Sequence, residues 1–190
     1  GQFGDAVINI SPITAEEAEA EDLKMKDGVV FVDKISGGVV PREYIPSIEY
    51  GVRQAALSDV KSGFPLINVK VELVFGSYHD VDSSQVAFEQ AGALALREAC
   101  DRAGLSLLEP IMKLQVVTPD EFFGNVSGDL ASRRGHILDS EVRGPVRFIN
   151  AEVPLSEMFG YTTTLRSMTQ GRATSTMEPA EYRPMPERLK

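Results

Sequence analysis

The second half of the chain contains an internal repeat, which constrains the fold more than any other feature of the sequence. Residues 118–124 (Thr-Pro-Asp-Glu-Phe-Phe-Gly) and 154–160 (Pro-Leu-Ser-Glu-Met-Phe-Gly) are offset by 36 positions, and Gly135 and Gly171 keep that offset. Each copy is typical of a strand, a capped helix, a glycine that ends the helix, and a strand. We expect the strands at 111–117, 137–142, 146–153 and 173–178.

Two βαβ units in tandem predict a ferredoxin-like split βαβ sandwich, in which two helices cover one face of an antiparallel sheet. Large apolar side chains recur at the helices of the repeat and should form its core. These expected core residues are Phe123, Leu130, Phe159 and Leu165.

A strand, a loop and a helix follow one another in the first half. Apolar residues alternate strictly along 67–75, which predicts a half-buried strand. The residues expected on its buried face are Ile67, Val69, Val71, Leu73 and Phe75. The following helix is expected from Ser83, with Asp82 and Gln85 as a capping box, and should end at Gly104. The loop 76–81 therefore lies at the tip of a stiff arm.

The other elements of the first half give the order β, β, α, β, α. Strands are expected at 2–10 and 29–35, separated by a polar, acidic surface segment at 14–28. A helix opens at Ile45-Pro46, because proline is favourable in a first turn. Its apolar stripe is Ile48, Val52, Ala55, Ala56 and Val60. The helix after the loop should pack on the sheet through Val86, Ala87, Ala91, Leu94, Ala95 and Ala99.

Composition excludes several classes of protein. Hydrophobic residues make up 43% of the 190, enough for a proper core, and no apolar run approaches the length of a membrane span. The single cysteine, Cys100, allows no intrachain disulfide, fits a reducing cytoplasmic location, and is expected in the core. With two histidines and no paired cysteines, we expect no metal site.

The charge of the chain is −9, and this acidity argues against a uniformly basic face for nucleic acid. The acidity is uneven, because five acidic residues fall within 16–22 while polar and basic residues gather where the two repeat helices end. The residues at those helix ends are Arg133, Arg134, Arg166, Gln170 and Arg172. They are either favourable charges near helix C-termini or contacts to an RNA backbone.

Four residues of the loop carry chemistry: Ser77, Tyr78, His79 and Asp80. They form either an ordinary polar loop or a contact surface on a rigid support. A catalytic triad is disfavoured, because neighbours on one loop rarely converge, and no Gly-x-Ser-x-Gly elbow occurs. We therefore predict no catalytic residue. His79 is better suited to stack on RNA or hydrogen-bond to it, and Tyr78 can either stack or pack inward.

Gly37 and Gly38 mark a second loop, interpreted either as a plain turn or as a tip where bare backbone approaches a partner. No Gly-x-x-x-x-Gly-Lys-Ser/Thr sequence occurs, so this loop is not a phosphate-binding P-loop.

Several segments together resemble the C-terminal part of translation elongation factor G. In the first half these are 1–4 (Gly-Gln-Phe-Gly), 37–41, 43–46 and 76–84; in the second half they are 108–112, 128–130, 133–135 and 153–161. The resemblance implies an α+β chain in two domains. Residues 1–107 would form the ribosomal-protein-like fourth domain with a left-handed βαβ crossover, and 108–190 the ferredoxin-like fifth domain.

The resemblance also implies a function. Gly37, Gly38 and His79 would lie near the codon–anticodon helix in the decoding centre of the small subunit, and promote movement of tRNA and mRNA. The fifth domain would contact the large subunit near the sarcin–ricin loop and the stalk base. The resemblance implies that GTP and magnesium belong to N-terminal domains absent here. The chain starts at Gly1 without methionine, in a strand-like pattern, so we expect it to be a fragment. The fragment is expected to be a monomer without cofactor or enzymatic activity.

Four other classes of protein also fit the sequence. The nearest are a ribosome-recycling paralogue and a ribosomal protection factor. A free-standing RNA-binding module and a small hydrolase built on Ser77 and His79 belong to other classes.

Overall fold

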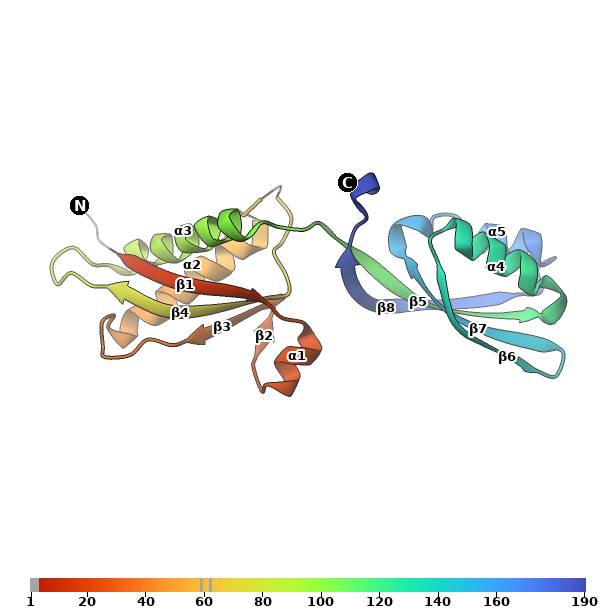
Figure 1. Ribbon diagram of the computed structural model, residues 1–190, viewed down its shortest axis with the longest axis horizontal. Coiled ribbons are helices and arrows are strands. Elements are labelled where there is room, and N and C mark those ends of the chain that lie inside the picture. The colour runs from red at the N-terminus through yellow and green to blue at the C-terminus, as the bar shows by residue number, and fades with distance from the viewer. Residues whose placement is uncertain (1–3, 59, 62) are drawn as a thin grey trace. The chain divides into compact units, whose positions relative to one another are not determined.

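The computed structural model describes residues 4–58, 60–61 and 63–190, and these form two compact units, 1–105 and 106–190 (Figure 1). Each unit has its own sheet, helices and core. Within the described residues, no helix is long and apolar enough to cross a membrane, and no cluster of His, Cys, Asp and Glu could hold a metal ion.

Unit 1 is a four-stranded sheet with two long helices on one face (Figure 1). Its strands are β1 (Asp5–Pro12), β2 (Met25–Lys26), β3 (Val29–Asp33) and β4 (Val69–Ser77), in the order β1-β4-β3-β2. β3 and β4 are parallel and are joined through α2 (Ile45–Ser58), whereas the other pairs are antiparallel. After β4 the chain continues into α3 (Gln85–Ala103). The predicted strand at 2–10 is β1, and residues 1–3 lie outside the described residues.

Glycines bring α2 and α3 into backbone contact. A Cβ added to Gly51 would lie 1.9 Å from the carbonyl oxygen of Glu89, and one added to Gly92 would lie 2.4 Å from that of Ile48. The predicted stripe of α2 is confirmed for Ile48, Val52, Ala55 and Ala56, which are all buried. Cys100 is buried as well, as expected.

The predicted start of α3 was wrong, and its predicted buried face was confirmed for Ala87 but wrong for Val86 and Leu94. Its buried residues are Ala87, Phe88, Gly92, Leu96 and Cys100, whereas Val86 and Leu94 are exposed. The N-cap is Ser84, whose hydroxyl accepts from the Ala87 N–H, so Asp82 and Gln85 do not form the capping box. Alanines occur on every side of this helix, so its apolar pattern did not define which side is buried.

The segment 14–28, predicted as a polar surface segment, is partly helical and contributes to a small core. It contains α1 (Ala15–Ala20), which begins with a capping box of Thr14 and Glu17. Ala18 packs with Ile13 and Val30 in a small second core, so α1 covers part of the sheet face that α2 and α3 leave open. An acidic helix of six residues has too short a pattern to be recognised from sequence.

A β-bulge at Val74 overturns the strict alternation predicted for β4. Val7 pairs with Phe75 and Ile8 pairs with Leu73, so Val74 is the extra residue. The bulge reverses the facing of the strand beyond it: Leu73 is fully buried, but Phe75 is 48% exposed and Gly76 is buried.

Unit 2 confirms the split βαβ prediction. Its strands are β5 (Leu108–Pro119), β6 (His136–Arg143), β7 (Val146–Pro154) and β8 (Thr174–Pro184), all antiparallel and in the order β6-β7-β5-β8. α4 (Phe123–Ser132) and α5 (Tyr161–Met168) pack on one face of the sheet. β8 extends beyond the predicted end at 178, because a bulge opposite Ile111 and Met112 lets pairing with β5 continue past Pro179.

The core prediction is confirmed for Leu130 and Leu165 but was wrong for Phe159, which is 96% exposed. The two repeat copies differ at their helix starts. Gly124 lies inside α4, so Phe123 packs against the core, whereas Gly160 precedes α5 in a left-handed conformation. The left-handed residue leaves Phe159 outside the helix and in solvent.

We expect Phe159→Ala to change the free energy of unfolding by less than about 0.5 kcal/mol, as for a surface substitution. The matched variant Leu165→Ala should lose about 2–5 kcal/mol, because it leaves a cavity in the core. Urea unfolding of both variants checks the pair, and an equal loss in both would contradict the exposure of Phe159.

Candidate functional site

Two loops lie at the same end of unit 1 (Figure 1). The glycine loop (residues 36–41) follows β3, and the histidine loop (residues 78–84) joins β4 to α3. Both ends of the histidine loop are anchored. Ser77 donates from Oγ to Asp5 Oδ2 over 3.0 Å, and Ser84 caps α3. The structure thus brings together the residues predicted at 37–38 and 77–80.

His79 is fixed through its backbone and displayed through its side chain. Its N–H donates to Ser83 Oγ over 2.8 Å, and the Ser83 N–H donates back to the His79 carbonyl over 3.0 Å. The imidazole Nδ1 lies 3.5 Å from Asp82 Oδ2, and the His79 side chain is 61% exposed. Ser77 turns to Asp5, so Ser77, His79 and Asp80 form no triad.

Tyr78 is 36% exposed, but its ring lies against Tyr44 and supports the loop from one side. Its ring centroid lies 5.8 Å from that of Tyr44, which in turn stacks on Phe88 at 4.8 Å. Tyr44 ends the short 3-10 turn η1 (Arg42–Tyr44) that follows the glycine loop. Loss of water around the Tyr78 hydroxyl, then the negative charge of Asp80, raise the pKa of Tyr78.

Gly37 and Gly38 present bare backbone. Both have positive φ, at 72° and 66°, and a Cβ added to either would meet nothing within 4 Å. Another residue type would be strained in these conformations although there is space for its side chain. The loop is held by Val40, which is buried.

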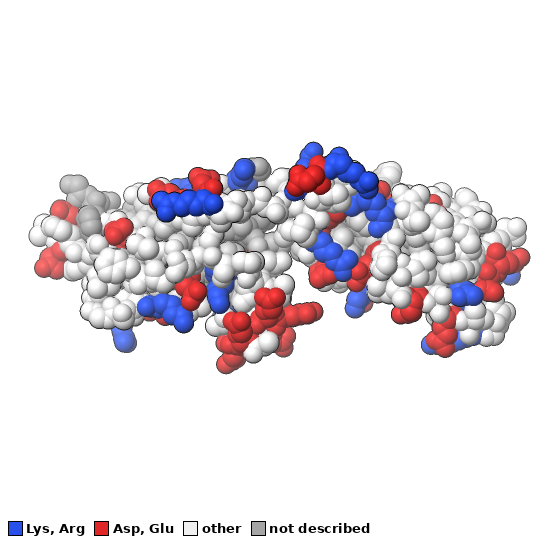
Figure 2. All heavy atoms as spheres, viewed as in Figure 1, with Lys and Arg blue, Asp and Glu red and all other residues white. Residues whose placement is uncertain are grey.

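The negative charge of unit 1 is concentrated away from these loops. Figure 2 shows a red cluster over α1, at the end of unit 1 opposite the two loops. Its residues are Glu16, Glu17, Glu19, Glu21 and Asp22. The loops themselves carry Asp80 and Asp82, so they are also acidic, but they lie apart from this larger cluster.

Arg133 and Arg134 are engaged inside unit 2. Arg133 donates to Asp129 Oδ2 at 3.0 Å and to the Glu157 and Phe159 carbonyls at 2.7 and 3.2 Å. Arg134 forms two hydrogen bonds to Glu109, at 2.8 and 2.9 Å, and one to Glu157 at 3.0 Å. These bonds hold the pKa of the buried Glu109 carboxyl below its usual range. Neither arginine therefore offers a free guanidinium at the surface.

The residues near the C-terminal end of α5 are more accessible to solvent than Arg133 and Arg134. Arg166 and Gln170 are exposed, and within the described part of the chain Arg166 has no ion pair. Arg172 binds Glu121 at 2.9 Å, but both side chains are more than half exposed. The predicted basic surface is therefore reduced to Arg166, Gln170 and Arg172.

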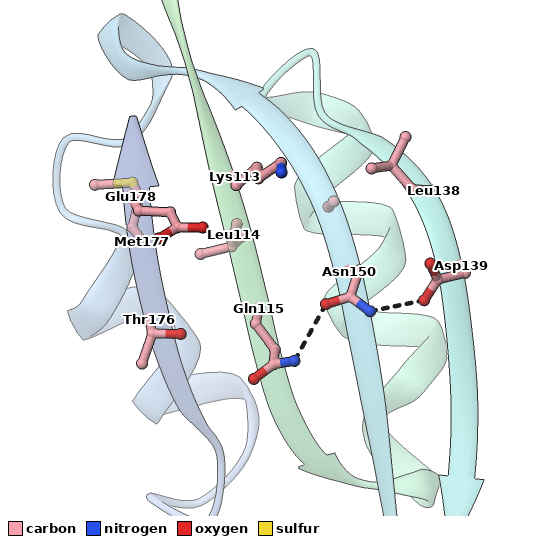
Figure 3. A pocket seen from close by; sticks show the side chains of 10 residues that line it. Lys113, Leu114, Gln115, Leu138, Asp139, Asn150, Thr176, Met177 and Glu178 are labelled. Carbon is pink, nitrogen blue, oxygen red and sulfur yellow. Dashed lines mark hydrogen bonds between the residues drawn. The ribbon is translucent and has the colours of Figure 1, made fainter. Parts of the chain in front are cut away.

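A hollow on the open face of the unit 2 sheet was not predicted. Its volume is about 510 Å³. A row of hydrogen-bonded polar side chains crosses it (Figure 3). Gln115 donates to Asn150 over 3.2 Å, and Asn150 donates to Asp139 over 2.7 Å. The polar alternation of Lys113 and Gln115 in β5 was the available signal for this surface.

The fold and the paired loops define a two-domain α+β chain that presents a rigidly mounted histidine beside an open glycine backbone. Known families match both units: elongation factor G, domain IV, over residues 1–104, and the elongation factor G C-terminus over 106–190. The chain therefore belongs to the elongation factor G family.

A solved structure supports this assignment. The chain is similar to a crystal structure of a protein from Thermus thermophilus, with a TM-score of 0.87 and 38% sequence identity. The match covers 100% of this chain and 27% of that chain, so this chain spans about a quarter of the solved relative.

Proposed function

We propose that this chain is the ribosome-contacting part of a translocation GTPase and that its two loops enter the A site of the small subunit. His79, Gly37 and Gly38 meet the codon–anticodon helix there and promote movement of tRNA and mRNA. GTP and magnesium are assigned to other parts of the parent protein, and the 190 residues themselves catalyse nothing.

The mounting of His79 is the observation that carries this proposal. Its planar side chain projects into solvent while Ser77, Ser83 and Ser84 hold the loop around it. A ring held in this way can stack on a base or hydrogen-bond to it with little ordering cost. The carboxylates of Asp80 and Asp82 repel phosphates, so the loop suits base edges and 2′-hydroxyls better than an RNA backbone.

For unit 2 we propose a contact to the large subunit, near the sarcin–ricin loop and the stalk base. In unit 2, the cationic residues of this contact are Arg166 and Arg172, which lie with Gln170 near the end of α5. Arg133 and Arg134 contribute by holding the turn at 157–159, since their donors are used within the unit.

The test uses the full-length factor with GTP on pre-translocation ribosomes in a single turnover. We expect fast movement of tRNA. Subunit splitting with the recycling factor, in the absence of movement, would instead identify a recycling paralogue. Release of a tetracycline block without movement would identify a protection factor.

In the same assay, we expect His79→Ala to slow tRNA movement by about 10- to 100-fold, the loss expected for one stacking contact of roughly 1–3 kcal/mol. The melting temperature should change little, because the side chain is exposed. Val81→Ala is the matched control, since Val81 is also exposed on the histidine loop and offers no polar group. Equal rates for wild type and His79→Ala would refute the role of His79.

A further inference from the structure

An aromatic stack connects the two loops. Tyr44, which follows the glycine loop, lies between Tyr78 of the histidine loop and Phe88 of α3. Phe88 is fully buried, so the stack begins in the core and ends at the residue next to His79. Displacement of Tyr44 therefore removes the support beneath the histidine loop.

A second contact connects the loops independently of the stack. A Cβ added to Gly76 would lie 2.6 Å from Val40 Cγ2 and 2.6 Å from the Asp5 carbonyl oxygen. Val40 of the glycine loop thus occupies the space that a side chain at the end of β4 would fill. Gly76 lies inward only because the bulge at Val74 reverses the facing of the strand.

We infer that Tyr44 is a positioning residue for His79 and that the two loops form one mechanical unit, held by the aromatic stack and by the Val40–Gly76 contact. Its kinetic consequence rests on the proposed function. Tyr44 touches no RNA in this role; it acts by holding Tyr78, and through it the backbone that carries the imidazole.

The experiment measures two quantities on the full-length factor: hydrogen exchange of the His79 and Ser83 N–H groups, and the single-turnover rate of tRNA movement at saturating factor. In Tyr44→Leu we expect roughly three- to tenfold faster exchange and a maximal rate lower by a similar factor, the scale of one aromatic contact. The factor concentration giving half the maximal rate should change less than the rate itself. Tyr44→Phe keeps the ring and should restore both quantities.

Two further variants separate positioning from general damage. Gly76→Ala would overlap both Val40 and the Asp5 carbonyl oxygen of β1 while the aromatic rings are unchanged, and it should produce the same pair of effects. Tyr50→Leu removes an exposed tyrosine from α2 and should change neither quantity. Unchanged exchange in Tyr44→Leu, or exchange as fast in Tyr44→Phe as in Tyr44→Leu, would overturn the inference. Faster exchange in a factor whose wild type moves no tRNA would support the coupling and refute the proposed function.

Discussion

Arg134→Ala is expected to destabilise unit 2 by about 3–5 kcal/mol, because it leaves the Glu109 carboxylate buried without its partner. The side chain of Glu109 is 4% exposed, and Arg134 supplies both of its guanidinium hydrogen bonds. In a unit of this size the loss corresponds to more than about 10 °C in melting temperature. Calorimetry of the whole chain measures it as a shift of the unit 2 transition.

The matched control is Arg143→Ala. Arg143 and Glu141 also approach to 2.8 Å, but their side chains are 62% and 61% exposed. An exposed ion pair is screened by water and contributes little, so the melting temperature should hardly change. Equal shifts in the two variants would show that burial does not set the strength of the Arg134–Glu109 pair.

The pair also predicts a pH dependence. The folded-state pKa of Glu109 is lowered, chiefly by its hydrogen bonds from Arg134. Stability from a lowered carboxyl pKa is present above the unfolded-state value, about 4.5, and is lost as pH falls through the folded-state value. The gap in stability between wild type and Arg134→Ala should therefore narrow below about pH 4.5. Glu109→Gln, which has no such titration, should lack this pH-dependent part.

Gly51→Ala should destabilise unit 1 by about 2 kcal/mol. An added methyl group would lie 1.9 Å from the Glu89 carbonyl oxygen, so α2 and α3 must separate. Alanine gains about 1 kcal/mol in helix propensity over glycine, and this gain offsets only part of the overlap. The loss is measured by urea unfolding.

Gly128→Ala is the control for that substitution. Gly128 lies within α4, and an added Cβ would meet nothing within 4 Å. The propensity gain is unopposed there, so this variant should be more stable than wild type. Stabilisation by Gly51→Ala as well would mean that the two helices do not pack through their glycines.

Most of the elements and the fold of each unit could be predicted from sequence. The repeat at 118–124 and 154–160 was sufficient for unit 2, because two βαβ units have one common way to share a sheet. Residues within a few positions of each other, such as those of the histidine loop, were also correctly grouped. Local pattern carries this information, since strand and helix periodicity are properties of neighbouring residues.

The sequence was insufficient where a residue distant along the chain decides, as at Arg134 and Tyr78, and where the two repeat copies differ locally, as at Phe159. The sequence suggests a surface cation at Arg134, because its partner Glu109 lies 25 positions earlier. It suggests a core residue at Phe159, because the repeat implies equivalence with Phe123, although a left-handed Gly160 separates the two cases. Tyr78 could not be assigned from sequence between stacking and support, because its neighbour Tyr44 belongs to another segment.

The bulge at Val74 divides β4 into two parts whose inward and outward side chains alternate out of step with each other. Up to Leu73 the odd positions belong to the core, and from Phe75 onward the even positions do. A polar residue in place of Leu73 would therefore be buried in the core, whereas a polar residue in place of Phe75 would face solvent, although both are odd positions of one strand. Loss of the bulge with all residues retained would turn Phe75 inward toward Val40, whereas deletion of Val74 would leave Phe75 facing outward and Gly76 facing inward.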